Sequence, residues 1–90
     1  MEFEWDPEKE RANIAKHRLD FQTAARVFLD PLLLEVEDDR GYDELRWNAI
    51  GMVDGRVLVV TYTLRGATYR IISARGAVPR ERRYYHNLQA

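Results

Sequence analysis

Residues 46–64 read RWNAIGMVDGRVLVVTYTL, two largely apolar runs joined by Asp54-Gly55. An Asp-Gly pair between two such runs is a strong local signal for a β-hairpin, because both residues tolerate the positive φ angles of a two-residue turn. The second run is almost continuously apolar, which is typical of a strand covered on both faces. The sequence therefore predicts antiparallel strands at residues 46–53 and 56–64, the second of them central in the sheet.

Further strands are predicted on both sides of this hairpin. Arg65-Gly66 marks a tight turn into a strand at residues 68–75, and residues 32–37 form a strand that ends in an acidic turn. Residues 2–5 alternate polar and aromatic side chains, which suits a short edge strand. We expect these strands to form one antiparallel sheet.

Helices are predicted before and after the central strands. Asp6-Pro7 supplies an N-cap and a proline at the first helical position, so a helix extends from Pro7 to about Lys16, with Asn13 on its wet face. Asp20 caps a second short helix, and Pro79 opens the last one. The order β-α-α-β-β-β-β-α predicts an α+β fold, in which two N-terminal helices pack on an antiparallel sheet with a C-terminal helix, as one domain over residues 1–90.

Composition limits the possible chemistry. The chain has no cysteine, so disulfides and thiol nucleophiles are excluded, and its two histidines cannot build a zinc site alone. We therefore expect no metal and no cofactor. The apolar runs are far shorter than the roughly 20 residues of a membrane span, so we expect a cytoplasmic protein without a membrane partner.

The net charge of −1 conceals a division between the two halves of the chain. Residues 1–45 hold 6 Lys/Arg and 13 Asp/Glu, whereas residues 46–90 hold 8 arginines and 2 acids. Arginine is suited to bidentate phosphate contacts, so the second half is expected to receive an anionic ligand. Mutual neutralisation of the two halves across the folded surface is the simpler explanation, and both can hold together.

The predicted strand YRIISAR carries Arg70 and Arg75, which strict alternation places on opposite faces of the sheet. Arginine is rarely found in an apolar strand of a small domain without an acidic partner or a ligand. We expect at least one of the two to bind an anion. The alternative is a salt bridge to Asp6, Glu35 or Glu37.

Arginines beside aromatic side chains suit single-stranded RNA, because they bind phosphates while the rings stack on bases. Metal-free RNA cleavage uses the ribose 2′-hydroxyl as nucleophile, so the protein has to position the strand, move protons and stabilise the charged phosphorane. His17 is the candidate proton carrier, and Lys16 beside it would lower its pKa. A histidine at a helix end also commonly caps the last carbonyls, which is the alternative role.

Four further residues are candidates for RNA contact. Arg80 and Arg83 place positive charge early in the last helix, where the positive end of the helix dipole opposes it. This unfavourable arrangement favours an anionic partner. The simpler interpretation is that both side chains lie on a solvated face of the helix. Tyr84 is a candidate for stacking on a base, although such tyrosines more often pack in the protein. Arg46 adds to the basic surface of the second half.

Residues along almost the whole chain match those of a known family. They are Trp5-Asp6, Lys9, Asn13, Lys16-His17, Phe21, Ala24-Ala25, Asp30-Pro31, Ile50-Gly51, Gly55-Arg56, Tyr62-Thr63, residues 70–75, Ala77, Glu81-Arg82 and Tyr85. On these positions the chain resembles BrnT-type toxins, most specifically in the Lys-His helix end and the Arg-Ile-Ile-Ser-Ala-Arg strand. Arg18 departs from the pattern where a glycine often follows the Lys-His pair, and Gly76 where a basic residue often follows Arg75.

The resemblance implies a RelE-like fold and a bacterial ribonuclease that arrests translation. It also implies a hetero-oligomer with a cognate, BrnA-like antitoxin of the ribbon-helix-helix type. The chain would contact operator DNA only through this antitoxin. On the matching positions it nominates Lys16, His17, Arg70 and Arg75, with the basic start of the last helix, as the RNA site.

Two alternatives to a ribonuclease remain open. The same arginine surface would serve a non-catalytic module that docks an antitoxin, and a structural subunit of a repressor complex would need no site of its own. The departures at Arg18 and Gly76 would alter a turn and remove a positive charge, so weaker activity than in typical relatives is expected.

Overall fold

The computed structural model describes residues 1–41 and 43–88. The predicted domain also includes residues 42, 89 and 90, which lie outside this description. The elements are β1 (Glu2–Trp5), α1 (Pro7–His17), α2 (Phe21–Ala25), the 3₁₀ helix η1 (Arg26–Leu29), β2 (Leu34–Asp38), β3 (Arg46–Val53), β4 (Arg56–Arg65), β5 (Thr68–Gly76) and α3 (Pro79–Asn87). The fold is α+β as predicted, but differs in detail because the predicted second helix is α2 continued by η1, and β2 begins two residues later than expected.

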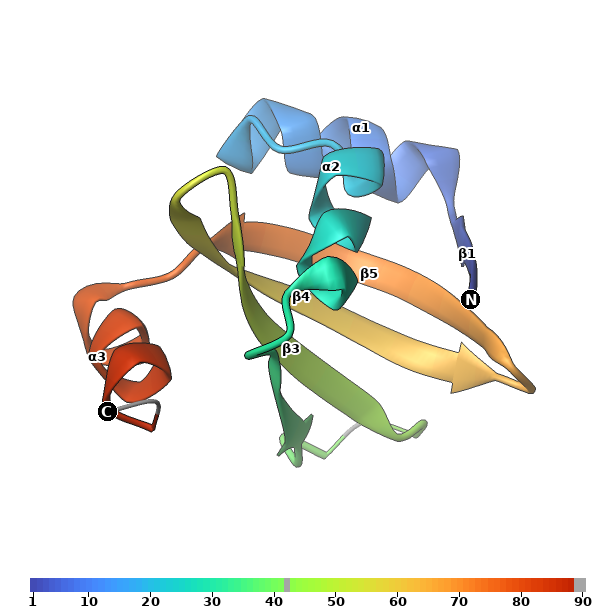
Figure 1. Cartoon of the computed structure of the whole chain (residues 1–90). Helices are drawn as coiled ribbons and strands as arrows, with labels where there is room; N and C mark the ends of the chain where they lie inside the picture. The colour runs from blue at the N-terminus through green and yellow to red at the C-terminus, as the bar shows by residue number, and fades with distance from the viewer. Residues whose placement is uncertain (42, 89–90) are drawn as a thin grey trace.

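Within the described residues the strands form one sheet in the order β1-β5-β4-β3-β2, with β4 in the middle as predicted (Figure 1). The prediction of an antiparallel sheet is wrong for one pair, because β1 runs parallel to β5. Parallel neighbours require a long connection, and the chain between β1 and β5 passes through all the other strands before it returns. The sheet is therefore mixed, and the RelE-like arrangement stays a prediction.

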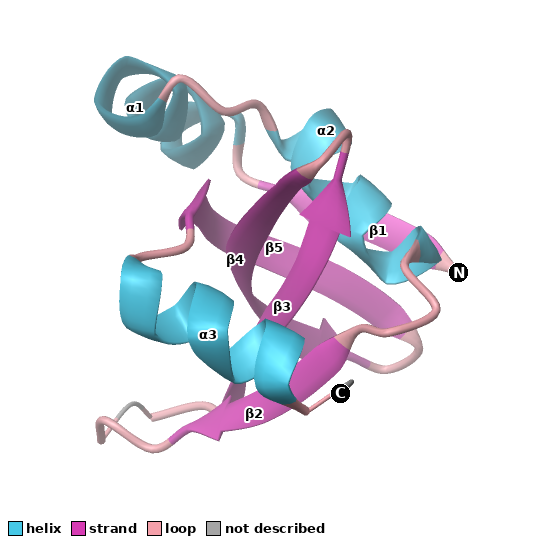
Figure 2. Ribbon diagram, turned by 60° about the vertical axis from the view of Figure 1, so that its left-hand side comes forward, coloured by secondary structure: helices cyan, strands magenta, loops and turns pink. Residues whose placement is uncertain are grey.

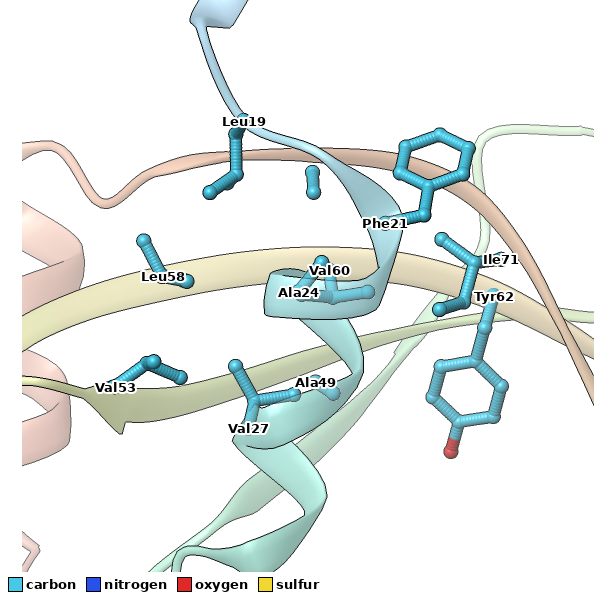
Figure 3. Packing of buried hydrophobic residues seen from close by; sticks show 11 residues of the cluster. Leu19, Phe21, Ala24, Val27, Ala49, Val53, Leu58, Val60, Tyr62 and Ile71 are labelled. Carbon is cyan, nitrogen blue, oxygen red and sulfur yellow. The ribbon is translucent and has the colours of Figure 1, made fainter. Parts of the chain in front are cut away.

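Helices cover both faces of the sheet. The N-terminal helices lie on one face and α3 lies on the other (Figures 1 and 2). The larger core fills the space under α2 and η1 (Figure 3). Its buried members are Leu19, Phe21, Ala24, Val27, Ala49, Val53, Leu58, Val60, Tyr62, Ile71 and Ala74. A smaller core joins α3 to the other face through Ile50, Val57, Val59, Ala77 and Tyr85.

Asn13 fixes α1 to the sheet, so the prediction that it faces water is wrong. It is only 6% exposed, and its amide exchanges two hydrogen bonds with the backbone of Ala74, at 2.9 and 3.0 Å. Its Nδ2 also donates to the carbonyl of Leu19 at 2.8 Å. Since β1 pairs with β5 only as far as Ile71, the Asn13 amide replaces a strand partner further along β5. This contact ties the end of α1 to the end of β5.

A β-bulge in β5 overturns the prediction that Arg70 and Arg75 face opposite ways. Thr61 pairs with Ser73 and Tyr62 with Ile71, so Ile72 is an extra residue without a cross-strand partner. One extra residue reverses the alternation, because side chains change face at every position. Arg70 pairs with Thr63 and Arg75 pairs with Val59, two residues on the same face of β4. Val59 belongs to the smaller core, so both arginines lie on the face that carries α3.

Tyr85 and Asp30 hold α3 in place. Tyr85 is 3% exposed and its hydroxyl donates to Oδ2 of Asp30, which also accepts from the backbone of Met52 at 2.8 Å. Burial alone would raise the pKa of Asp30, but the hydrogen bonds from Tyr85 and from backbone N–H groups outweigh it and hold the pKa below its usual value. The carboxylate therefore stays ionised and anchors the helix to the turn before β2.

Candidate functional site

A pocket of about 590 Å³ opens where four elements meet. These are the end of α1, the turn between β3 and β4, the end of β5, and α3, which lie on the same side of the molecule (Figure 1). The lining residues are His17, Met52, Gly55, Arg56, Val57, Arg75, Gly76, Ala77, Val78, Arg82 and His86. We call this site the basic pocket, because its lining includes arginines and histidines and none of the described residues that line it is acidic.

Local structure explains how the basic side chains converge. His17 ends α1, Arg56 begins β4 directly after the Asp54-Gly55 turn, and Arg75 precedes the last residue of β5. Arg82 and His86 are four residues apart, so they share one flank of α3. Each group therefore comes from the end of an element or from one helix flank.

Gly76 makes room for Arg56. Leu58 is paired with Gly76 across the sheet, so Arg56 reaches the same edge from the neighbouring strand. A Cβ atom at position 76 would clash with Nη2 of Arg56. The positive charge that a basic residue at position 76 would bring is thus supplied from β4.

The pocket arginines differ in how far they are neutralised. Arg75 makes a bidentate ion pair with Glu81, at 2.7 and 2.8 Å. The hydrogen bond from Arg75 holds the pKa of Glu81 below its usual value, and the same bond raises the pKa of Arg75. Nη1 of Arg82 donates to the carbonyl of Ala77 at 2.8 Å.

Arg56 and His17 are different, because within the described part of the chain neither side chain makes a hydrogen bond or an ion pair. The capping role considered for His17 is therefore not seen in this structure. A free guanidinium and a free imidazole beside two further arginines form a site that favours a phosphate or another anion.

The predicted catalytic residues fall into two places. His17 and Arg75 line the basic pocket together. Lys16 is exposed beside His17 and does not line it. Arg70 pairs with Thr63 and Arg75 with Val59, four residues apart on β4, so the two arginines lie about 13 Å apart along the sheet. Nη1 of Arg70 forms a 2.6 Å ion pair with Glu4. Both strand arginines therefore form salt bridges, which was the alternative to anion binding. Their partners are Glu4 and Glu81 instead of Asp6, Glu35 or Glu37.

The predicted RNA-binding residues are spread around the face that carries α3. Arg80 and Tyr84 line a second, smaller pocket between α3 and the sheet. Arg83 is exposed and lies on the side of α3 opposite the buried Tyr85. Arg46 lies at the far end of the sheet, opposite Asp38 in the β2–β3 pairing and 3.7 Å from Glu44.

Sequence reasoning missed Arg56, Arg82 and His86 as members of one site. Pairing of the strands around the Arg65-Gly66 turn would have placed the start of β4 beside the end of β5, and therefore Arg56 beside Gly76. The spacing of Arg82 and His86 indicates a shared helix flank. No local signal connects either feature to His17, which joins the site only through tertiary packing.

Two tyrosines of the sheet that could also stack on a base or donate a proton, Tyr62 and Tyr69, are packed in the structure. Tyr62 is buried, and its hydroxyl donates to Glu35. Burial, followed by this hydrogen bond, raises the pKa of Tyr62. Tyr69 lies against the rings of Phe3, Phe28 and Tyr62. The packing interpretation holds for both.

Two features are absent from the described residues. None of the described helices is long and apolar enough to cross a membrane. The described residues also contain no group of three or more His, Cys, Asp or Glu side chains able to hold a metal ion.

Comparison with known families gives one match. Residues 5–81 match the model of the family described as the ribonuclease toxin, BrnT, of type II toxin-antitoxin systems. The chain belongs to the BrnT family. No curated protein matches this sequence. The family is that of ribonuclease toxins, which implies an RNA target and an antitoxin partner.

The matched region of this BrnT family member holds most of the basic pocket. It includes His17, Arg56, Arg75 and Gly76, and it ends at Glu81, the partner of Arg75. Arg82 and His86 follow directly on the same helix. Among the described lining residues, Arg82 and His86 alone therefore lie beyond the matched region.

Arg18 keeps the backbone geometry that a glycine would provide. It ends α1 with φ 56° and ψ 38°, and its N–H donates to the carbonyl of Ile14 at 2.8 Å. This is the left-handed conformation that commonly terminates helices. The arginine adopts this conformation in spite of its Cβ, and a turn that differs from that of relatives with glycine stays a prediction.

Proposed function

We propose that this chain is a metal-independent endoribonuclease toxin that cleaves RNA and thereby arrests translation. In this proposal it is neutralised by a cognate ribbon-helix-helix antitoxin of the BrnA type, and it meets operator DNA only through that partner. The observation that carries the proposal is the basic pocket, where three arginines and two histidines line one cavity. An RNA backbone supplies the anion that such a site favours.

The pocket residues account for each requirement of phosphodiester cleavage. The 2′-oxygen attacks the adjacent phosphorus after losing its proton, the bond from phosphorus to the 5′-oxygen breaks, and that oxygen receives a proton. His17 and His86 are the two proton carriers, because an imidazole can accept and donate a proton and both residues line the pocket. The products are a 2′,3′-cyclic phosphate and a 5′-hydroxyl.

Arginines stabilise the charge that develops during this step. Arg56 has no partner among the described residues, so it is free to bind a phosphate oxygen directly. Arg75 and Arg82 are held by Glu81 and by the carbonyl of Ala77, so they present their remaining N–H groups from fixed positions. Fixed donors stabilise a phosphorane without reorganisation, and each is typically worth 10²–10³-fold in rate.

Residues outside the pocket keep supporting roles in this proposal. Lys16 adjoins His17 at the end of α1 and adds a positive charge beside the pocket. Arg46, Arg70, Arg80 and Arg83 contact the backbone of the RNA on either side of the cleaved bond, with Tyr84 against a base.

The test is cleavage of a labelled mRNA by the antitoxin-free protein in the presence of EDTA, with and without ribosomes. We expect wild type to cleave and leave 2′,3′-cyclic phosphate ends. His17→Ala and Arg75→Ala, with unchanged circular dichroism, are expected to lose at least 100-fold in rate. Folded wild type that cleaves nothing under any of these conditions would contradict the proposal.

A non-catalytic binding module is the second candidate, and the salt bridges favour it. Both strand arginines are paired with acids, Arg70 with Glu4 and Arg75 with Glu81, so part of the arginine surface is already neutralised. In this case the chain binds RNA or the antitoxin in a salt-sensitive way and forms no product.

A further inference from the structure

A groove beside the basic pocket has the composition of a small-molecule site. It lies between α3 and the sheet, with a volume of about 310 Å³. Its lining residues are Val36, Asn48, Ile50, Val59, Arg80, Glu81 and Tyr84. We call it the α3 groove. A mostly apolar lining with a few polar groups is typical of sites for flat organic ligands.

The α3 groove and the basic pocket are neighbours. Glu81 lines the groove, Arg75 lines the pocket, and these two side chains are joined by the bidentate ion pair. Val59 in the groove is also the cross-strand partner of Arg75. A phosphate bound in the pocket would therefore have its own nucleoside within reach of the groove.

Tyr84 supplies an aromatic surface to the groove. It is 46% exposed, unlike its buried neighbour Tyr85. The aliphatic residues Ile50 and Val59 belong to the smaller core and form the opposite, apolar side of the lining. A planar ring can stack on Tyr84 and bury its faces there.

Asn48 and Glu81 offer complementary hydrogen-bonding groups. Oδ1 of Asn48 accepts from the hydroxyl of Thr61 at 2.7 Å, which leaves the Nδ2 donors without a partner among the described residues. Oε1 of Glu81 accepts from Arg75 and from the backbone of Val78, whereas Oε2 accepts only from Arg75. One acceptor site on Oε2 therefore remains available.

We propose that the α3 groove binds the nucleobase beside the cleaved phosphate and prefers guanine, an inference that rests on the proposed function. The Watson–Crick edge of guanine presents one carbonyl acceptor next to two N–H donors, whereas uracil has one N–H between two carbonyls and adenine has no carbonyl. The carbonyl receives a hydrogen bond from Nδ2 of Asn48, and an N–H group donates to Oε2 of Glu81. The ring stacks on Tyr84 while the phosphate enters the basic pocket.

The test uses ligands that need no cleavage. The four nucleoside 3′-monophosphates and inorganic phosphate are titrated into wild type, Tyr84→Phe, Tyr84→Ala, Asn48→Ala and the control Leu88→Ala, with binding followed by NMR. Leu88 is an exposed apolar residue next to α3 that lines neither the groove nor the pocket. We expect wild type and Leu88→Ala to bind the guanosine nucleotide about tenfold more tightly than the pyrimidine nucleotides.

The variants separate stacking from base selection. We expect Tyr84→Ala to weaken all four nucleotides at least about fivefold, Tyr84→Phe to retain their affinity, and Asn48→Ala to remove the preference for guanosine. None of them should change the affinity for inorganic phosphate.

The outcomes distinguish this inference from the proposed function. Phosphate binding without any difference among the four nucleotides would overturn the proposal that the α3 groove selects a base. The proposal that the basic pocket binds phosphate would stand. A guanosine preference that Asn48→Ala does not alter would also overturn it. If the preference and its loss are seen but wild type cleaves no RNA, the groove stands and the ribonuclease proposal fails.

Discussion

Arg18 ends α1 in a backbone conformation that glycine adopts without cost. Its φ of 56° brings Cβ close to the backbone, a strain of about 1 kcal/mol for a residue other than glycine. We expect Arg18→Gly to raise the free energy of unfolding by about 0.5 kcal/mol, because the relief of this strain is partly offset by the entropy that glycine gains in the unfolded chain. Urea denaturation measures this.

The control for Arg18 is Ala12→Gly, at an exposed position inside the same helix. There the helical φ is negative, so glycine should cost about 1 kcal/mol. Loss of stability in both variants would mean that position 18 is not strained.

The ion pair between Arg75 and Glu81 predicts a pH dependence of stability. Arg75 lowers the pKa of Glu81 in the folded protein below the ordinary value of 4.5. A lowered pKa stabilises the fold at pH values above the unfolded pKa, and this contribution is lost as the pH falls through the folded pKa. The difference in free energy of unfolding between wild type and Arg75→Ala should therefore be largest near neutral pH and shrink below about pH 4.

Urea denaturation at pH 7 and pH 3.5 measures that difference, and an NMR titration of the Glu81 carboxyl checks its cause. We expect the Glu81 pKa to rise in Arg75→Ala. A Glu81 titration curve that is the same in both proteins would contradict the assignment.

At this scale the sequence predicted only part of the site. His17 and Arg75 were predicted from the chemistry of their side chains, and the structure places them in one pocket. Arg56 and His86 were missed, because nothing in their local sequence distinguishes them from ordinary surface residues. Their shared position depends on strand pairing and on the docking of α3.

Among the elements, the contact between α1 and β5 controls where His17 lies. Asn13 makes three hydrogen bonds there, two of them with the backbone of Ala74. Asn13→Ala removes the partner of the Ala74 N–H and of the carbonyls of Leu19 and Ala74, which costs about 2 to 4 kcal/mol. We expect a large drop in the thermal midpoint, whereas Asn87→Ala at the exposed end of α3 should change it little.

Asn13→Asp is an informative companion to Asn13→Ala. The carboxylate keeps the acceptor for the N–H of Ala74 but cannot donate to the carbonyls of Leu19 and Ala74. It should therefore be destabilising as well. Native stability in either variant would contradict the anchoring role of Asn13.

Most elements were predictable because their boundaries carry strong local signals. The Asp54-Gly55 turn, Pro7 and Pro79 all lie where the sequence placed them, at the start of β4, α1 and α3. The parallel pairing of β1 and the bulge at Ile72 were not predictable in this way. Both depend on contacts between distant segments, and no glycine marks the bulge.

For the whole molecule, charge is separated between the surfaces rather than cancelled everywhere. Ion pairs join the two halves in both directions, because Glu4 of the first half pairs with Arg70 and Asp54 of the second half pairs with Arg26. The described residues that line the basic pocket include no acid. The division seen along the sequence thus leaves one cationic cavity, formed by elements from both halves of the chain.

The proposed function requires that RNA is cleaved in the basic pocket rather than along the strand near Arg70. Single-turnover cleavage of a short oligoribonucleotide by Arg56→Ala and Arg65→Ala tests it directly. These residues begin and end β4, and both are exposed. Each substitution removes the same charge. We predict a loss of at least about 100-fold for Arg56→Ala and a rate within about twofold of wild type for Arg65→Ala. Equal rates for the two folded variants would contradict the account.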